Sequence, residues 1–432
     1  MIAFWIGLPI GLRLTLLAVL GLAGGGLANY VIYTFAYFNP RSISPWGRAS
    51  EQAPQRKASD RMPVLGWLGL RREASLHGSG FWIRPLLIEL ALAIALPALY
   101  WFEAQAGGLL PVGVGNPAFF EARATQIFFA HAILVILMVA ATFIDFDEKT
   151  IPDVITIPGT LIALIIASST VFAFMPTSVA LKGGGFSVLP TTFNSPWFAP
   201  PAKWMTTTGL WTGIAIWSGW CFALADRRWS GVVLRRRGLS RAIEHFLNGV
   251  FHYGFWKVLL AIWLIGAIGI SIVWNMGGNH WLGLFSALAG LAVGGGVVWA
   301  IRIVATWSLN MEAMGFGDVT LMAMIGAFIG WQAAIIAFFL SPFAAIVIVL
   351  VRYIVTRDAY TPFGPYLCAG TMLTILFWDS VYNDWLATNL RMIGPMLLWL
   401  CLTMLMLMAI MLFVWRHIKM ALFRGHHGED EE

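Results

Sequence analysis

The stretch Ile144-Asp145-Phe146-Asp147-Glu148-Lys149-Thr150-Ile151-Pro152-Asp153 joins two long apolar runs of the chain. About 20 mostly apolar residues are enough to cross a bilayer as a helix. The stretch therefore predicts two membrane helices joined by a short polar turn, with Asp145 at the edge of the apolar region. An ionisable group at that depth is costly, so Asp145 is a candidate functional residue.

The composition of the whole chain supports a membrane protein. Of its 432 residues, 59% are hydrophobic and 11% are charged, whereas a soluble globular protein has about 25% charged residues. The net charge of +6 does not indicate a nucleic-acid partner, because basic residues collect at the ends of membrane helices. Three widely spaced cysteines predict neither a disulfide framework nor a metal cluster. We expect an all-α, polytopic helical bundle.

Eleven apolar runs are candidate membrane helices, and the plausible number of spans is 8 to 11. The eighth run is short and ends at Gly330-Trp331, which predicts a tight turn into the ninth and a hairpin that need not cross completely. The eleven runs lie near 14–38, 85–103, 124–144, 154–175, 206–225, 258–276, 282–303, 319–330, 333–351, 363–378 and 393–415.

The distribution of basic residues predicts the orientation of these helices. With the N-terminus outside and eleven alternating spans, 22 of the 27 lysines and arginines lie in inside segments and four lie outside. The C-terminus is then cytoplasmic. Asp145 and Asp318 fall on the same cytoplasmic side, although neither residue entered the count.

Polar loops divide the chain into five regions. The loop 39–84 is basic and cytoplasmic, the loop 176–205 is expected to be external and irregular, and the loop 226–257 is basic and cytoplasmic. Residues 239–246 within the last loop form either an amphipathic surface helix or part of a plain topogenic loop. The regions are 1–103, 104–175 with the first aspartate, 176–305 with additional helices, 306–378 with the second aspartate, and 379–432.

The second motif is Gly315-Phe316-Gly317-Asp318, at the start of an apolar helix. Its glycines permit unusual backbone angles and leave room for a peptide or another helix to approach closely. A helix N-terminus favours an ionised Asp318, and a second carboxylate nearby would then tend to keep its proton. Such a pair suits aspartic-protease chemistry, in which one group activates water and the other donates a proton.

Each aspartate also has an ordinary structural explanation. A single aspartate at a helix end is usually a cap, Asp147 can be solvated, and Asp153 suits the first turn of a helix that starts near Pro152. Sequence spacing alone does not place Asp145 and Asp318 together. The shared side, the similar depth and the glycines favour a site.

Several segments resemble the type IV prepilin peptidases. They include Ile144-Asp145, the segment 151–159, Gly315-Phe316-Gly317-Asp318-Val319-Thr320-Leu321 with Gly326, Gly330 and Trp331, and Pro362-Phe363-Gly364-Pro365-Tyr366-Leu367. Two upstream segments, 62–68 and 84–89, resemble the cytoplasmic loop and second-helix start of the bifunctional bacterial enzymes.

The resemblance implies an aspartic endopeptidase of the bacterial inner membrane. Its catalytic pair would be Asp145 and Asp318, and its substrates would be prepilins or pseudopilins cut at the cytoplasmic face beside the lipid. Proteolysis would need no cofactor. The remaining residues expected to shape the site are Gly315, Gly317, Asp147, Pro152 and Asp153.

Two departures from this family concern its cofactors and its length. Bacterial members carry two Cys-x-x-Cys pairs in the first loop, but residues 70–78 contain no cysteine, so a four-thiolate zinc site cannot form here. We expect His77 to be a surface residue rather than a ligand. Methylation of the new N-terminus with S-adenosylmethionine is left open by the altered loop. The second departure is the insert 176–305, for which docking of a partner or substrate is one hypothesis.

Two other classes of function remain. A transporter could use Asp145 and Asp318 as ion or proton ligands at helix ends. A catalytically silent relative could act as an assembly scaffold. Cleavage by the wild type and its loss in Asp318→Asn would separate the peptidase from both.

Overall fold

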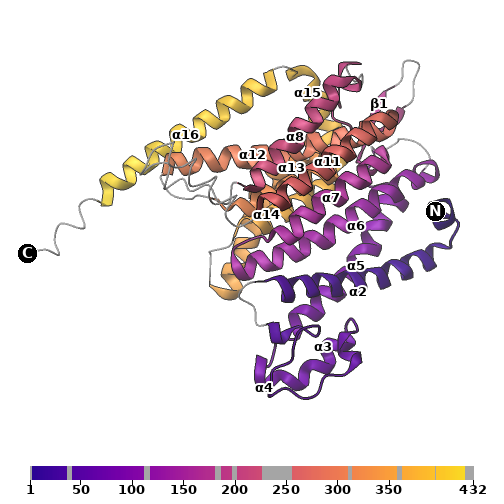
Figure 1. Ribbon diagram of the computed structural model, residues 1–432, viewed down its shortest axis with the longest axis vertical. Helices are drawn as coiled ribbons and strands as arrows, with labels where there is room; N and C mark the ends of the chain where they lie inside the picture. Colours follow the sequence, from indigo (N-terminus) through magenta and orange to yellow (C-terminus); the bar gives the residue numbers. More distant parts are fainter. Residues whose placement is uncertain are drawn as a thin grey trace, which may run out of the picture.

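The computed structural model describes residues 2–36, 41–110, 117–180, 186–196, 202–225, 255–309, 314–357, 362–394 and 396–423. Within these residues all regular secondary structure is helical except for one two-stranded hairpin (Figure 1). Seven of the described helices are long and apolar enough to cross a membrane. The prediction of an all-helical polytopic membrane protein is therefore confirmed, while the number of spans and their orientation stay predictions.

Each of the eleven predicted apolar runs overlaps a helix. The long helices are α2 (Ile10–Phe35), α5 (Ile83–Tyr100), α6 (Pro117–Glu148), α7 (Asp153–Ser169), α8 (Thr207–Ala225), α11 (Phe255–Met276), α12 (Gly278–Leu309), α13 (Phe316–Thr356), α14 (Gly364–Leu376) and α16 (Met396–Phe423). The shorter helices are α1 (Ile2–Ile6), η1 (Arg41–Ile43), η2 (Ala58–Arg61), α3 (Leu65–Leu70), η3 (Arg71–Glu73), α4 (Ala74–His77), η4 (Trp101–Gln105), η5 (Val171–Ala173), η6 (Ala202–Met205), η8 (Asp379–Leu386) and α15 (Ala387–Ile393).

Helix α13 contains the predicted turn between the eighth and ninth runs. Gly330 interrupts it with φ 82° and ψ 167°, a left-handed conformation that glycine adopts without the steric cost of a side chain. A methyl group on Gly326 would lie 3.5 Å from Cβ of Ala334, although residues eight apart in a straight helix are about 12 Å apart. The chain therefore folds back at Gly330, as Gly330-Trp331 predicted.

Small residues allow the helices around α13 to pack with their backbones in contact. A side chain on Gly290 of α12 would overlap the carbonyl of Gly326, and one on Gly326 would overlap the carbonyl of Gly290. A side chain on Gly370 of α14 would likewise overlap the carbonyl of Ala337. Close approach at small residues is a main way in which membrane helices associate. Helix α13 contacts α12, α14 and α7.

Residues 41–82 form a polar subdomain that connects α2 to α5 and lies beside the ends of these helices (Figure 1). Glu89 of α5 joins it to the helices, because this buried carboxylate accepts hydrogen bonds from the Val64 backbone N–H, from Trp67 Nε1 and from Asn29 Nδ2 of α2. The last two bonds are both 2.9 Å long. A buried carboxylate needs such donors, so the subdomain is held firmly against the bundle.

The prediction of an irregular loop over 176–205 is wrong for its first part. Strands β1 (Pro176–Ala180) and β2 (Phe186–Pro190) form an antiparallel hairpin in which Pro176 pairs with Pro190. β-Branched residues such as Val179 and Val188 suit strands, but the Gly, Pro, Ser and Thr content of the segment obscured this signal. The possible surface helix at 239–246 lies outside the described residues.

Candidate active site

Asp145 lies in the last turn of α6 and is only 3% exposed. The helix ends because Lys149 takes a left-handed conformation with φ 57°. The Lys149 N–H still donates to the Asp145 carbonyl at 2.8 Å, so Asp145 belongs to the final hydrogen-bonded turn. Its carboxylate is therefore carried by a helix end and not by a loose loop.

The start of α14 supplies a backbone donor to this carboxylate. The N–H of Gly364 donates to Oδ2 of Asp145 at 3.1 Å, across 219 positions of sequence. A methyl group on Gly364 would overlap that same oxygen and would come within 2.8 Å of Cδ1 of Ile151. Sequence reasoning gave Gly364 no role, although a glycine at the start of an apolar helix was a signal that could have indicated one.

Asp318 occupies the first turn of α13 and is 7% exposed. The backbone of Gly315 hydrogen-bonds its carboxylate, and Asp145 and Asp318 lie close enough to interact electrostatically. The two predicted aspartates thus come near each other at the end of α6 and the start of α13, two helices that touch only locally. Two nearby carboxylates are the arrangement that aspartic proteases use.

The glycines of the second motif meet one of the two expectations for them, room for a close approach, and not the other, unusual backbone angles. Neither Gly315 nor Gly317 has a positive φ, so the motif does not need glycine for unusual backbone angles. At Gly317 the need is space, because a methyl group there would lie 3.0 Å from Cβ and 3.1 Å from N of Ile151. The segment that approaches Gly317 is therefore the chain just after the first motif.

This packing joins the two motifs. Ile151 is 1% exposed. It packs against both Gly317 and Gly364, and it fills the space that a side chain at either position would need. Pro152 precedes α7 in an extended conformation, and Asp153 is the first residue of that helix, as predicted. An acidic residue in a first turn favours the helix dipole. The turn after Asp145 thus fixes the starts of α7, α13 and α14 relative to one another.

Asp147 is not simply solvated, as one of its sequence interpretations had it. Its carboxylate forms a two-pronged ion pair with Arg84 of α5, at 2.7 Å from Nη1 and 2.9 Å from Nη2. Asp147 therefore ties the end of α6 to the start of α5.

Cys368 is a buried neighbour of the pair that the sequence did not point to. Its thiol donates to the carbonyl of Met138 with an S–O distance of 3.8 Å and lies in electrostatic range of both Asp145 and Asp318. The thiol lies on α14, one turn beyond Gly364. It fills the space behind the carboxylates with a small and weakly polar group.

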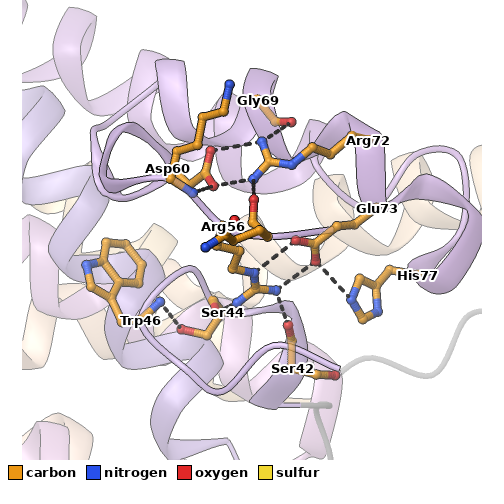
Figure 2. Close-up of polar contacts among 11 residues, drawn as sticks. Ser42, Ser44, Trp46, Arg56, Asp60, Gly69, Arg72, Glu73 and His77 are labelled. Carbon is orange, nitrogen blue, oxygen red and sulfur yellow. Dashed lines mark hydrogen bonds and ion pairs between the residues drawn. The ribbon is translucent and has the colours of Figure 1, made fainter. Parts of the chain in front are cut away.

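The polar subdomain is held by arginine–carboxylate pairs (Figure 2). Arg56 donates to both oxygens of the fully buried Glu73, at 2.9 and 2.8 Å, and to the Ser44 carbonyl at 2.6 Å. His77 was expected at the surface, but its side chain is 8% exposed and its Nε2 lies 3.5 Å from Glu73. The residue as a whole is partly exposed, and its ring packs on Phe81.

A second pair joins Arg72 to the buried Asp60 (Figure 2). No group of three potential metal ligands occurs in the described chain. The two buried carboxylates of the subdomain are already engaged by arginines, and the loop has no cysteine. The residues present therefore do not fit a structural zinc ion, and charge pairing stabilises the subdomain instead.

The subdomain is expected to lose stability in acid. Hydrogen bonds from Arg72 and from the Lys57 N–H hold the pKa of Asp60 below its usual range, although burial opposes this. A carboxyl group whose pKa is lowered by folding stabilises the fold above its unfolded pKa and loses that effect as pH falls through its folded pKa. Proteolytic protection of residues 41–82 should therefore stay constant from pH 7 to about 4 and fall below that.

Asp60→Asn is the matched variant for this pH dependence. It leaves Arg72 without its charge partner and should cost about 2 kcal/mol of subdomain stability at pH 7. The variant should also show a weaker dependence on pH between 4 and 2. Equal acid sensitivity of the variant and the wild type would contradict the assignment to Asp60.

The comparisons with known proteins find sequence similarity to leader peptidases. A family described as "Type IV leader peptidase family" matches residues 254–350, which include Asp318 but not Asp145. Proteins named "Prepilin leader peptidase/N-methyltransferase" are similar in sequence. That of Aeromonas hydrophila is 35% identical over 110 residues, covering 24% of this chain and 36% of the relative.

Two further relatives carry the same name. The protein of Pseudomonas putida is 30% identical over 117 residues, covering 26% of this chain and 39% of the relative. The protein of Pseudomonas aeruginosa PAO1 is 30% identical over 192 residues, covering 38% and 64%. In each case the matched part is less than two thirds of the relative's length. No solved structure shows a significant match. Over part of its length the chain is therefore similar to proteins named prepilin leader peptidase/N-methyltransferase, and its residues 254–350, which carry Asp318, match the type IV leader peptidase family.

Proposed function

We propose that this protein is an intramembrane aspartic endopeptidase. It removes the basic leader from prepilin-like or pseudopilin precursors at the cytoplasmic face of the bacterial inner membrane. The observation that supports the proposal is that Asp145 and Asp318, which come from different helices and are 173 positions apart in the sequence, lie within electrostatic range of each other.

The proposed chemistry follows from two carboxylates that hold one proton between them. The ionised carboxylate takes a proton from water, whose oxygen attacks the scissile carbonyl carbon while the other carboxyl group protonates the carbonyl oxygen. Collapse of the resulting diol breaks the C–N bond, and a proton passes to the leaving amine. The Gly364 N–H occupies one lone pair of Asp145 Oδ2 and holds that oxygen in place.

The location of the pair supports a substrate that is itself a membrane helix. Asp145 ends the apolar helix α6, and Asp318 begins the apolar helix α13. A precursor whose basic leader stays in the cytosol could place its apolar helix beside these helices and its scissile bond at their ends. A transporter reading has less support, because the carboxylates lie at helix ends and not halfway along the helices.

The relatives are also named N-methyltransferases. We assign no residue of this chain to S-adenosylmethionine, because the altered loop offers arginine–carboxylate pairs and no distinct site. The mass of the cleaved product therefore shows whether that product is methylated.

The test is co-expression of the wild type with several prepilins in membranes, followed by the mass of the pilin N-terminus. Loss of the leader is the expected result, and an additional 14 Da (about one methylene) would show methylation. If a well-folded wild type leaves every precursor intact, including precursors from its own genome, the peptidase proposal fails and the scaffold reading is favoured.

A further inference from the structure

Arg84 lies at the start of α5 and contacts the end of α6 from behind the candidate site. Its guanidinium group binds both oxygens of Asp147, at 2.7 and 2.9 Å. A two-pronged arginine–carboxylate pair fixes direction as well as distance. The pair therefore restrains the orientation of the last turn of α6.

The same guanidinium group makes a second contact with α6, on the other side of Asp145. It lies 5.8 Å from the centre of the Phe143 ring. Phe143 and Asp147 stand two residues before and two residues after Asp145, so each lies roughly 160° around the helix from it. Arg84 thus holds the face of α6 opposite to Asp145, whose own carboxylate accepts the Gly364 N–H.

The last turn of a helix needs such support. The final carbonyl groups of any helix lack partners within it, so the end tends to fray. In α6 the regular structure stops at Glu148, and the bond from Lys149 N–H to the Asp145 carbonyl is the one that closes the turn. Opening that turn would move the Asp145 carboxylate away from Gly364.

Arg84 is itself held in place. It donates to the hydroxyl of Tyr33 at 3.2 Å, and its guanidinium lies 5.7 Å from the centre of that ring. The next residue, Pro85, accepts a 2.9 Å hydrogen bond from Asn29 through its carbonyl. Tyr33 and Asn29 both belong to α2. The contact on α6 is therefore made from a fixed base formed by α2 and α5.

From these contacts we propose that Arg84 is a positioning residue for Asp145. It holds the last turn of α6 from behind, and this keeps the carboxylate directed at Gly364 and near Asp318. The proposal rests on the peptidase function for its kinetic consequence, but its structural consequence can be measured without any substrate.

The kinetic test compares Arg84→Gln, Arg84→Lys and the control Arg72→Gln. The control breaks the other two-pronged arginine–aspartate pair, with Asp60 in the polar subdomain. We expect kcat of Arg84→Gln to fall about 10-fold with KM within about twofold, because a displaced catalytic group loses rate and not binding. Arg84→Lys should recover part of the loss, since it keeps the charge without the fork, and Arg72→Gln should keep the wild-type kcat.

The double variant Arg84→Gln with Asp147→Asn shows whether Arg84 acts through Asp147. If it does, the double variant should be no slower than Arg84→Gln alone, because both changes remove one interaction. Losses that multiply would overturn the proposed route through Asp147.

Hydrogen exchange separates this proposal from the proposed function. In the Arg84→Gln variant, amides of residues 145–149 should exchange about 10-fold faster than in the wild type, while Arg72→Gln should leave them unchanged. This readout holds even if the wild type cleaves no precursor. Unchanged exchange at residues 145–149 in Arg84→Gln, or an equal increase in Arg72→Gln, would overturn the positioning role.

Discussion

Asp318→Asn is expected to lower the rate of leader cleavage about 1000-fold, and Asp145→Asn should do the same. Asparagine has nearly the same shape as aspartate but neither takes nor gives a proton in this reaction. Because both carboxylates are buried at helix ends and lie close together, each neutral replacement should fit its site. The rate is measured as leader loss from a prepilin in membranes, with melting of the purified variants to verify folding.

Asp379→Asn is the matched control for this pair of variants. Asp379 starts η8, beyond the C-terminal end of α14, and its carboxylate pairs with Asn383 at 3.0 Å. About 20 Å of helix separates it from Gly364, so the control should cleave at the wild-type rate. Retained cleavage by a well-folded Asp318→Asn or Asp145→Asn would rule out the proposed aspartic mechanism, whatever the control does.

The positions of the helices could be predicted from the sequence because they depend on local apolar length. Each predicted run overlaps a helix, and even the turn at Gly330 was indicated by the short eighth run. The hairpin of β1 and β2 was missed because its pairing competes with strong turn signals nearby. The length and hydropathy of a segment predict a membrane helix well, but they predict the short strands of a hairpin poorly.

The partners of each aspartate could not be predicted in the same way. The bond from Gly364 to Asp145 spans 219 positions, and the pair of Arg84 with Asp147 spans 63. Such contacts depend on how helices pack, and no local pattern encodes them. The motif glycines illustrate the limit, because the sequence indicated room for a close approach at Gly317 but not that Ile151 is the residue that approaches.

The site combines parts that have separate structural origins. The α6 end carries Asp145, the α13 start carries Asp318, and the α14 start supplies the Gly364 N–H. Close packing at Gly290 and Gly326 fixes α13 against α12, away from the carboxylates. Packing changes at those glycines should therefore lower stability, whereas changes at Gly364 should act on the carboxylate itself.

Gly364→Ala is accordingly expected to lower cleavage about 100-fold while the protein stays folded. The new methyl group would overlap Oδ2 of Asp145 and lie 2.8 Å from Cδ1 of Ile151. Both neighbours are side-chain ends, so they can rotate away without moving a helix backbone. The rotation removes the 3.1 Å bond from the Gly364 N–H and displaces the carboxylate, and a displacement of about 1 Å can cost about 100-fold in rate.

Gly296→Ala on α12 is the control, because a methyl group there meets no atom within 4 Å. It should cleave at the wild-type rate and melt at or above the wild-type temperature, since alanine favours a helix over glycine by about 1 kcal/mol. Gly364→Ala should melt within a few degrees of the wild type yet cleave slowly, with kcat and not KM affected. The added methyl group in Gly364→Ala would occupy the space of the Asp145 carboxylate, so the carboxylate has to move. A Gly364→Ala protein that cleaves as fast as Gly296→Ala would therefore show that the Gly364 contact does not orient Asp145.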